Sequence, residues 1–169
     1  GKNLFLSTLA AYFLGQKEMF KGLYLEKAEE EQAIQEGRAA WQEYPVLYLD
    51  FNTGNYGESD DLSINLNNHL CKWEKQYGTE VSEQTFALRF AGVIERAYKQ
   101  TGKQVVILVD EYDKPLLQTM GTNEALNEQY RNALKAFYSV IKTCDQYIRF
   151  AFLTGVTKFS KVSIFSDLN

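Results

Sequence analysis

The sequence predicts an α/β fold with a parallel sheet and helices on both of its faces. Short apolar runs alternate with segments in which apolar residues recur at helical spacing, which is the pattern of a parallel α/β sheet. One run, residues 105–109 (VVILV), has no polar position and is typical of a strand buried on both faces. Right-handed crossovers then place helices on both sides of the sheet, which gives three layers.

The first forty residues are predicted to be mostly helical. Residues 3–14 carry apolar side chains at helical spacing, and residues 17–25 are mixed, as in a loop or a short helix. Residues 26–42 are rich in Glu, Ala and Gln, which predicts a solvated helix. The acidic run at residues 29–31 is expected to be the exposed face of this helix.

From residue 46 onward, strands and helices alternate. The apolar run at residues 105–109 requires cover on both faces and partners on both edges, so this strand is expected to lie centrally between the other two. The predicted elements are a strand at 46–51, a loop at 52–60, helices at 62–77 and 86–98 (the second closed by Gly102), the strand at 105–109, a helix at 126–141 and a strand at 147–153.

Composition narrows the class of protein. The 169 residues, 45% of them hydrophobic, are enough for one domain with a sizeable core. The net charge of -4 shows no excess of basic residues that would indicate nucleic-acid binding. His69 is the single histidine, which excludes histidine-based metal sites and Ser-His or Cys-His catalysis. Cys71 and Cys144 have no motif spacing and are expected to be reduced thiols. No apolar run reaches the length of a membrane span and no signal peptide is visible, so we expect a cytoplasmic protein without a membrane partner.

Two carboxylates, Asp110 and Glu111, follow directly after the central strand. In an open parallel sheet, ligands bind outside the carboxyl ends of the strands. This is the Walker B pattern of P-loop nucleoside triphosphatases, in which the first acid serves Mg²⁺ and the second orients the attacking water. A structural alternative stays open, because such acids also cap helices or are simply solvated. Asp113 is expected to lie in the following loop and to pair locally.

The first residues of the chain indicate the phosphate-binding motif that accompanies a Walker B strand. A phosphate-binding loop reads G-x-x-x-x-G-K-[ST] and then enters a helix, and Gly1 and Lys2 precede a predicted helix. The chain is therefore expected to start on the last Gly and Lys of that motif. The earlier glycine and the phosphate-loop strand are expected upstream of Gly1, so that residues 1–169 form a domain truncated at its N-terminus and at its C-terminus.

Four segments resemble the predicted AAA-ATPase-like family of bacterial proteins. They are GKNLFLSTLAAYFLGQKEMFKGL at the start, YPVLYLDFN, VVILVDEYDKPLL and FLTGVTKFSKVSIFSDLN at the end. The resemblance covers nearly the whole chain and implies a P-loop fold in which residues 46–51 are the extra strand between the phosphate-loop strand and the Asp-Glu strand. In that family the domain is N-terminal and is commonly followed by one similar to PD-(D/E)XK nucleases.

The resemblance implies ATP and Mg²⁺ as the ligands of the full-length protein. Gly1 and Lys2 match the phosphate-binding Gly and Lys. Asn3 stands where the family usually has Ser or Thr, whose hydroxyl sits on Mg²⁺. The carbonyl of an Asn side chain also ligates hard cations, which makes Asn3 a candidate ligand for the nucleotide-bound metal, although it stands further from the backbone.

Roles for three further positions are implied in the same way. Asp110 matches the Mg²⁺-side acid and Glu111 the catalytic acid that orients water. Thr154 matches the polar position after the next strand, a sensor that contacts the γ-phosphate or the water.

Two functions remain open. In the first, the full-length protein binds and hydrolyses ATP and couples this to an attached effector, such as the nuclease-like domain. In the second, the domain is a degenerate nucleotide-binding or protein-interaction module without turnover. Asn3 favours the second function, and the Asp110-Glu111 pair favours the first. We also expect residues 1–169 alone to bind ATP poorly, and the open flank of the strand at 147–153 to favour a homo-oligomer or a local covering segment.

Overall fold

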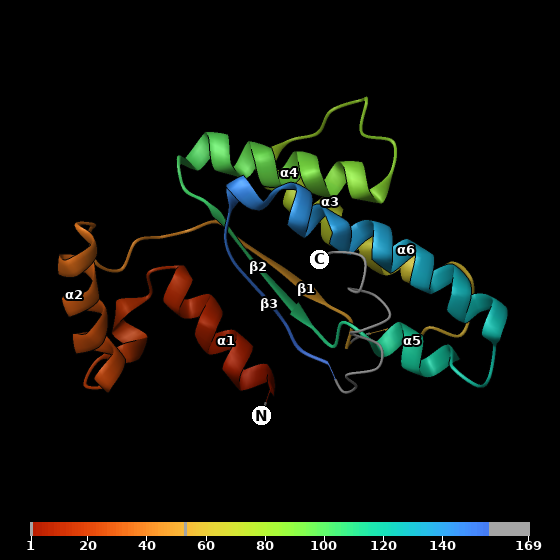
Figure 1. Ribbon diagram of the computed structural model, residues 1–169, viewed down its shortest axis with the longest axis horizontal. Coiled ribbons are helices and arrows are strands. Elements are labelled where there is room, and N and C mark those ends of the chain that lie inside the picture. Colours follow the sequence, from red (N-terminus) through yellow and green to blue (C-terminus); the bar gives the residue numbers. More distant parts are fainter. Residues whose placement is uncertain (1, 53, 156–169) are drawn as a thin grey trace.

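The computed structural model describes residues 2–52 and 54–155, without the side chains of residues 2 and 3. Its sheet has three parallel strands, which lie in the order β1 (Val46–Asp50), β2 (Val105–Asp110) and β3 (Ile148–Leu153) (Figure 1). All residues of β2 are buried and β2 pairs on both sides, whereas β1 and β3 each pair only with β2 within the described residues. The predicted α/β class and the central position of the Asp-Glu strand are confirmed.

One face of the sheet is covered by α1 (Lys2–Phe13), which runs antiparallel to the strands (Figure 1). The ring of Phe5 lies edge-on to Phe152, near the carboxyl end of β3, with centroids 5.5 Å apart. Eight positions later, Phe13 stacks on Phe150 at 5.2 Å. The N-terminus of α1 therefore lies at the carboxyl end of the sheet.

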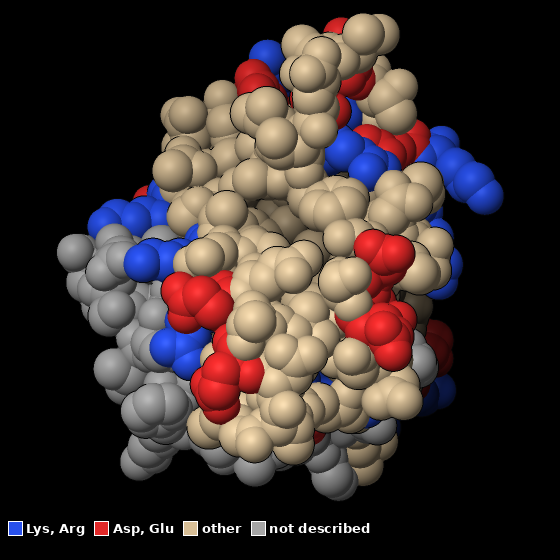
Figure 2. All heavy atoms as spheres, turned by 90° about the vertical axis from the view of Figure 1, so that its right-hand side faces the viewer, with Lys and Arg blue, Asp and Glu red and all other residues tan. Residues whose placement is uncertain are grey.

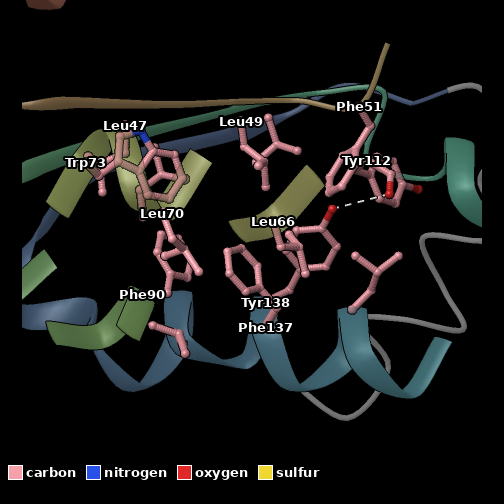
Figure 3. Close-up of a cluster of buried hydrophobic side chains, with 14 of the residues drawn as sticks. Leu47, Leu49, Phe51, Leu66, Leu70, Trp73, Phe90, Tyr112, Phe137 and Tyr138 are labelled. Atoms are coloured by element: carbon pink, nitrogen blue, oxygen red, sulfur yellow. Dashed lines mark hydrogen bonds between the residues drawn. The ribbon is translucent and has the colours of Figure 1, made fainter. Parts of the chain in front are cut away.

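The other face is covered by α3 (Asp61–Tyr77), α4 (Phe86–Thr101) and α6 (Glu124–Thr143), which enclose the main core (Figure 3). At its centre the rings of Phe90 and Phe137 stack in parallel, with centroids 4.3 Å apart. Apolar side chains thus fill both sides of the sheet, and the predicted three layers are present.

The helical N-terminal region differs in detail from the prediction. Residues 17–25 contain the 3-10 helix η1 (Lys17–Phe20), and α2 spans Tyr24–Glu36 rather than 26–42. The helix ends early because Gly37 adopts the left-handed conformation, with φ of 67°, and its N–H bonds to carbonyls of the last turn.

A short helix that the sequence analysis did not predict, α5 (Lys114–Thr119), follows β2. Pro115 stands in its first turn, where the missing N–H of proline costs no helical hydrogen bond. Asp113 immediately precedes the helix, and its carbonyl accepts the N–H groups of Leu116 and Leu117. Asp113 thus lies in the turn between β2 and α5, as expected, and its side chain is fully buried.

The expectation that residues 29–31 form an exposed face is wrong for Glu29, which is only 4% exposed. Arg38 donates to both carboxylate oxygens of Glu29, at 2.7 and 3.0 Å. The hydroxyl of Tyr12 and the backbone N–H of Trp41 donate to the same carboxylate, at 2.5 and 3.0 Å. Glu29 therefore ties α2 to α1 and to the segment that leads into β1.

The stability of this N-terminal region is expected to depend on pH through Glu29. Hydrogen bonds from Arg38 are the main cause that lowers the pKa of Glu29 from 4.5 to about 2. A lowered pKa stabilises the folded state at neutral pH, and this contribution is lost progressively as the pH falls from 4.5 toward 2. Its full size is about 3 kcal/mol.

Glu29→Gln should therefore reduce the free energy of unfolding at pH 7 and flatten its decrease below pH 4.5. Urea denaturation of both proteins across this pH range measures the effect. Glu31→Gln is the matched control, because Glu31 is exposed on the same helix. Equal acid sensitivity in the Glu29 variant and the wild type would contradict the assignment.

Candidate functional site

Three of the sequence-predicted residues meet at the carboxyl edge of the sheet. Asp110 ends β2, Glu111 follows it, and Thr154 follows β3. The hydroxyl of Thr154 donates to Oδ1 of Asp110 at 2.9 Å and accepts the backbone N–H of Glu111 at 3.2 Å. The backbone N–H of Thr154 continues the ladder to the carbonyl of Val109 at 2.9 Å. One threonine thus connects the ends of two strands and both acids.

A fourth residue, Asn52, joins this group from the end of β1. Its side-chain amide donates to Oδ2 of Asp110 at 2.9 Å. Its backbone N–H donates to Oδ1 of Asp50 at 2.7 Å, and its carbonyl accepts from Nζ of Lys114 at 2.6 Å. The sequence analysis assigned Asn52 only to a loop. Its place directly after a strand next to β2 was the available signal, because parallel strands end at a common edge.

The carboxylate of Asp110 is buried, at 1% exposure, and accepts hydrogen bonds from a hydroxyl and an amide. Within residues 4–52 and 54–155, no Lys or Arg side chain forms an ion pair with it. A buried carboxylate without a counter-charge is costly, and a hard cation with oxygen ligands supplies that charge.

A metal held by protein groups alone is not favoured here. Among the described residues, no cluster of three or more His, Cys, Asp or Glu side chains is arranged to hold a metal ion. Mg²⁺ commonly binds through one or two carboxylates together with phosphate oxygens and water. The donor set at Asp110 fits an ion of that kind, delivered with a phosphate ligand.

Glu111 has a strained backbone, with φ of 57° in the left-handed region that glycine favours. Its N–H bonds to the Thr154 hydroxyl, and the N–H of Lys114 bonds to its carbonyl at 3.1 Å. Strain of this kind persists only where surrounding contacts impose it, and it clusters at functional sites. The turn lets the chain leave β2 abruptly and enter α5.

The backbone of Lys2 starts α1 at the same end of the sheet as Asp110 (Figure 1). A helix N-terminus presents free N–H groups that attract anions. Gly1, the side chains of Lys2 and Asn3, and residues 156–169 lie outside the described residues. Their predicted roles therefore stay predictions.

Comparison with known sequences identifies the family. Residues 1–165 match the family described as Predicted AAA-ATPase. The chain belongs to the predicted AAA-ATPase family. The resemblance seen in the sequence motifs is confirmed.

A curated relative extends the comparison beyond this domain. The "Uncharacterized protein in vnfD 5'region" of Azotobacter chroococcum mcd 1 is 39% identical over 170 residues. The match covers all of this chain and 31% of the relative, so the AAA-ATPase-like chain spans about a third of the length of that relative. No solved structure matches the chain.

One face of the AAA-ATPase-like chain is mixed in charge (Figure 2). On the face shown in Figure 2, acidic and basic side chains are interspersed with uncharged ones, and the described residues form no continuous basic area there. None of the described helices is both long and apolar enough to cross a membrane.

Gly155 packs closely against the turn that follows Asp110 and Glu111. A Cβ at this position would lie 2.1 Å from Cε1 of the Tyr112 ring and 2.9 Å from Oδ1 of Asp113. The backbone N–H of Tyr112 also bonds to the carbonyl of Thr154 at 2.8 Å, so the two segments cannot simply move apart. Only glycine fits between the end of β3 and the turn that carries Glu111.

Gly155→Ala is therefore expected to destabilise the domain by about 1–3 kcal/mol, the usual cost of overpacking. The melting temperature and the midpoint of urea unfolding measure the change. Gly57→Ala is the control, because a Cβ at Gly57 meets no atom within 4 Å. If both variants unfold at the same midpoint, the close approach at Gly155 is not a constraint.

Proposed function

We propose that this chain is the nucleotide-binding and hydrolysing domain of an ATPase. The observation that carries the proposal is the buried carboxylate of Asp110, which has a hydrogen-bond donor on each oxygen and no ion-pair partner among the described side chains. Glu111 stands beside it, at the sheet edge where the N-terminus of α1 also lies. Membership of the predicted AAA-ATPase family supports a nucleotide as the ligand.

Each residue has a distinct part in this proposal. Gly1 and Lys2 bind the β- and γ-phosphates at the start of α1. Asp110, with Asn3, holds the Mg²⁺ of the bound nucleotide, whose charge offsets that of the phosphate oxygens. Glu111 orients the attacking water and takes its proton.

Thr154 acts on this site through Asp110. A hydroxyl has one proton, and in this arrangement it is donated to the Asp110 carboxylate. The hydroxyl therefore holds the acid rather than donating to a phosphate, while the N–H of Glu111 occupies one of its acceptor positions.

We further propose that hydrolysis drives an attached effector. The longer length of the curated relative leaves room for other domains in a full-length protein. A second candidate function, a nucleotide-binding module without turnover, is favoured by one observation, the Asn at position 3 where a Ser or Thr hydroxyl usually serves Mg²⁺.

The test uses the natural protein in which this chain occurs. Glu111→Gln should retain ATP binding and reduce hydrolysis about a hundredfold or more, because an amide cannot act as the base. Binding is followed with a fluorescent nucleotide and turnover by phosphate release. Glu128→Gln, an exposed position on α6, should leave both unchanged.

The outcomes separate the two functions. Turnover that is lost in the Glu111 variant supports the ATPase. Nucleotide binding by the wild type without any turnover supports the second function, and turnover unchanged by Glu111→Gln removes Glu111 from the mechanism.

A further inference from the structure

The second oxygen of Asp110 is held by a residue that no motif assigns. Asn52 lies 58 positions upstream of Asp110 and its side-chain amide reaches Oδ2 at 2.9 Å. The orientation of this amide follows from its partner, because an ionised carboxylate only accepts hydrogen bonds and the NH₂ group must face it. Together with Thr154 on Oδ1, the amide gives each oxygen of Asp110 one fixed donor.

Further contacts hold Asn52 itself in place. Its N–H donates to the Asp50 carboxylate at 2.7 Å, and its carbonyl accepts from Nζ of Lys114 at 2.6 Å. These contacts come from β1 and α5, which are two different elements. The amide of Asn52 is therefore positioned before any ligand arrives, although the residue as a whole is exposed.

Side chains of α3 hold the end of β1, which lies next to Asn52. The backbone N–H of Asp50 donates to Nε2 of His69 at 3.1 Å, and the side-chain amide of Asn65 donates to the carbonyl of Asp50 at 3.1 Å. Burial lowers the pKa of His69, which favours the neutral ring that this acceptor role requires. The end of β1 is thus fixed from the helix layer as well as from β2.

We propose that Asn52 is a positioning residue for the metal-binding carboxylate of Asp110. Donors on both oxygens fix the plane of the carboxylate and leave a free lone pair on each oxygen for a cation or its water. A carboxamide does this without adding a second negative charge beside Asp110. The inference rests on the proposed function, because it assigns Asp110 to the cation that accompanies the nucleotide.

A positioning role makes a prediction that a purely structural role does not. Hydrogen-bond partners of a metal ligand typically contribute about 10–100-fold to metal affinity. In the natural protein, Asn52→Ala should therefore raise the Mg²⁺ concentration for half-maximal ATP binding by about 10–100-fold. The affinity for ATP in the presence of a chelator should not change, since the proposed effect of Asn52 passes through Asp110.

The experiment measures binding of a fluorescent ATP analogue against Mg²⁺ concentration, and repeats it with Mn²⁺. Asn55→Ala is the matched control, because Asn55 is exposed in the same loop and makes no side-chain hydrogen bond in the structure. In a protein that already carries Asp110→Asn, adding Asn52→Ala should produce no further change. Melting temperatures of all variants verify that the domain is folded.

Each outcome decides one point. The inference is supported if Asn52→Ala raises the Mg²⁺ concentration needed for ATP binding in the wild type but not in the Asp110→Asn protein. If ATP binding by the wild type depends on Mg²⁺ and the Asn52 variant shows the same dependence, the inference is overturned. The ATPase proposal is then unaffected. A wild type that binds no nucleotide with or without Mg²⁺ overturns both.

Discussion

The complete burial of β2 is the constraint on which the rest of the structure depends. The residues from Val105 to Val109 are at most 1% exposed, and a polar side chain in that interior would need a partner that the apolar layers do not offer. The first carboxylate can stand only where the strand leaves these layers, which is the position of Asp110. Because all three strands are parallel, the ends of β1 and β3 reach the same point. Apolar packing in the middle of the sheet thus determines where polar chemistry is concentrated.

How much could be predicted from the sequence depended on whether the signal was local. The uninterrupted apolar run identified the central strand, the position directly after it identified Asp110, and the family resemblance pointed to Thr154. Asn52 directly follows the predicted strand at 46–51 and Asn55 does not, but the stretch that holds both is rich in Gly, Asn and Ser and does not show which of them contacts Asp110. What separates them is a contact across 58 positions, and this arises only when the sheet has formed. Gly1 and the side chain of Lys2, which the sequence predicts to bind phosphate, lie outside the described part of the chain.

Glu29 was misjudged for a related reason. A run of acids on a helix is usually solvated, and α2 has no apolar stripe that would indicate which side packs. This helix is fastened by a carboxylate that receives four hydrogen bonds, from Arg38, Tyr12 and Trp41. Each donor comes from outside α2, so the composition of the helix itself carries no trace of the interaction.

The left-handed backbone of Glu111 has a consequence for substitutions at this position. A glutamate at φ of 57° is strained, whereas Gly or Asn adopts that conformation with little or no cost. Replacement of Glu111 by Gly or Asn would therefore relieve strain in the turn and at the same time remove the carboxylate. At position 111 the stability of the turn and the proposed chemistry thus make opposite demands on the side chain.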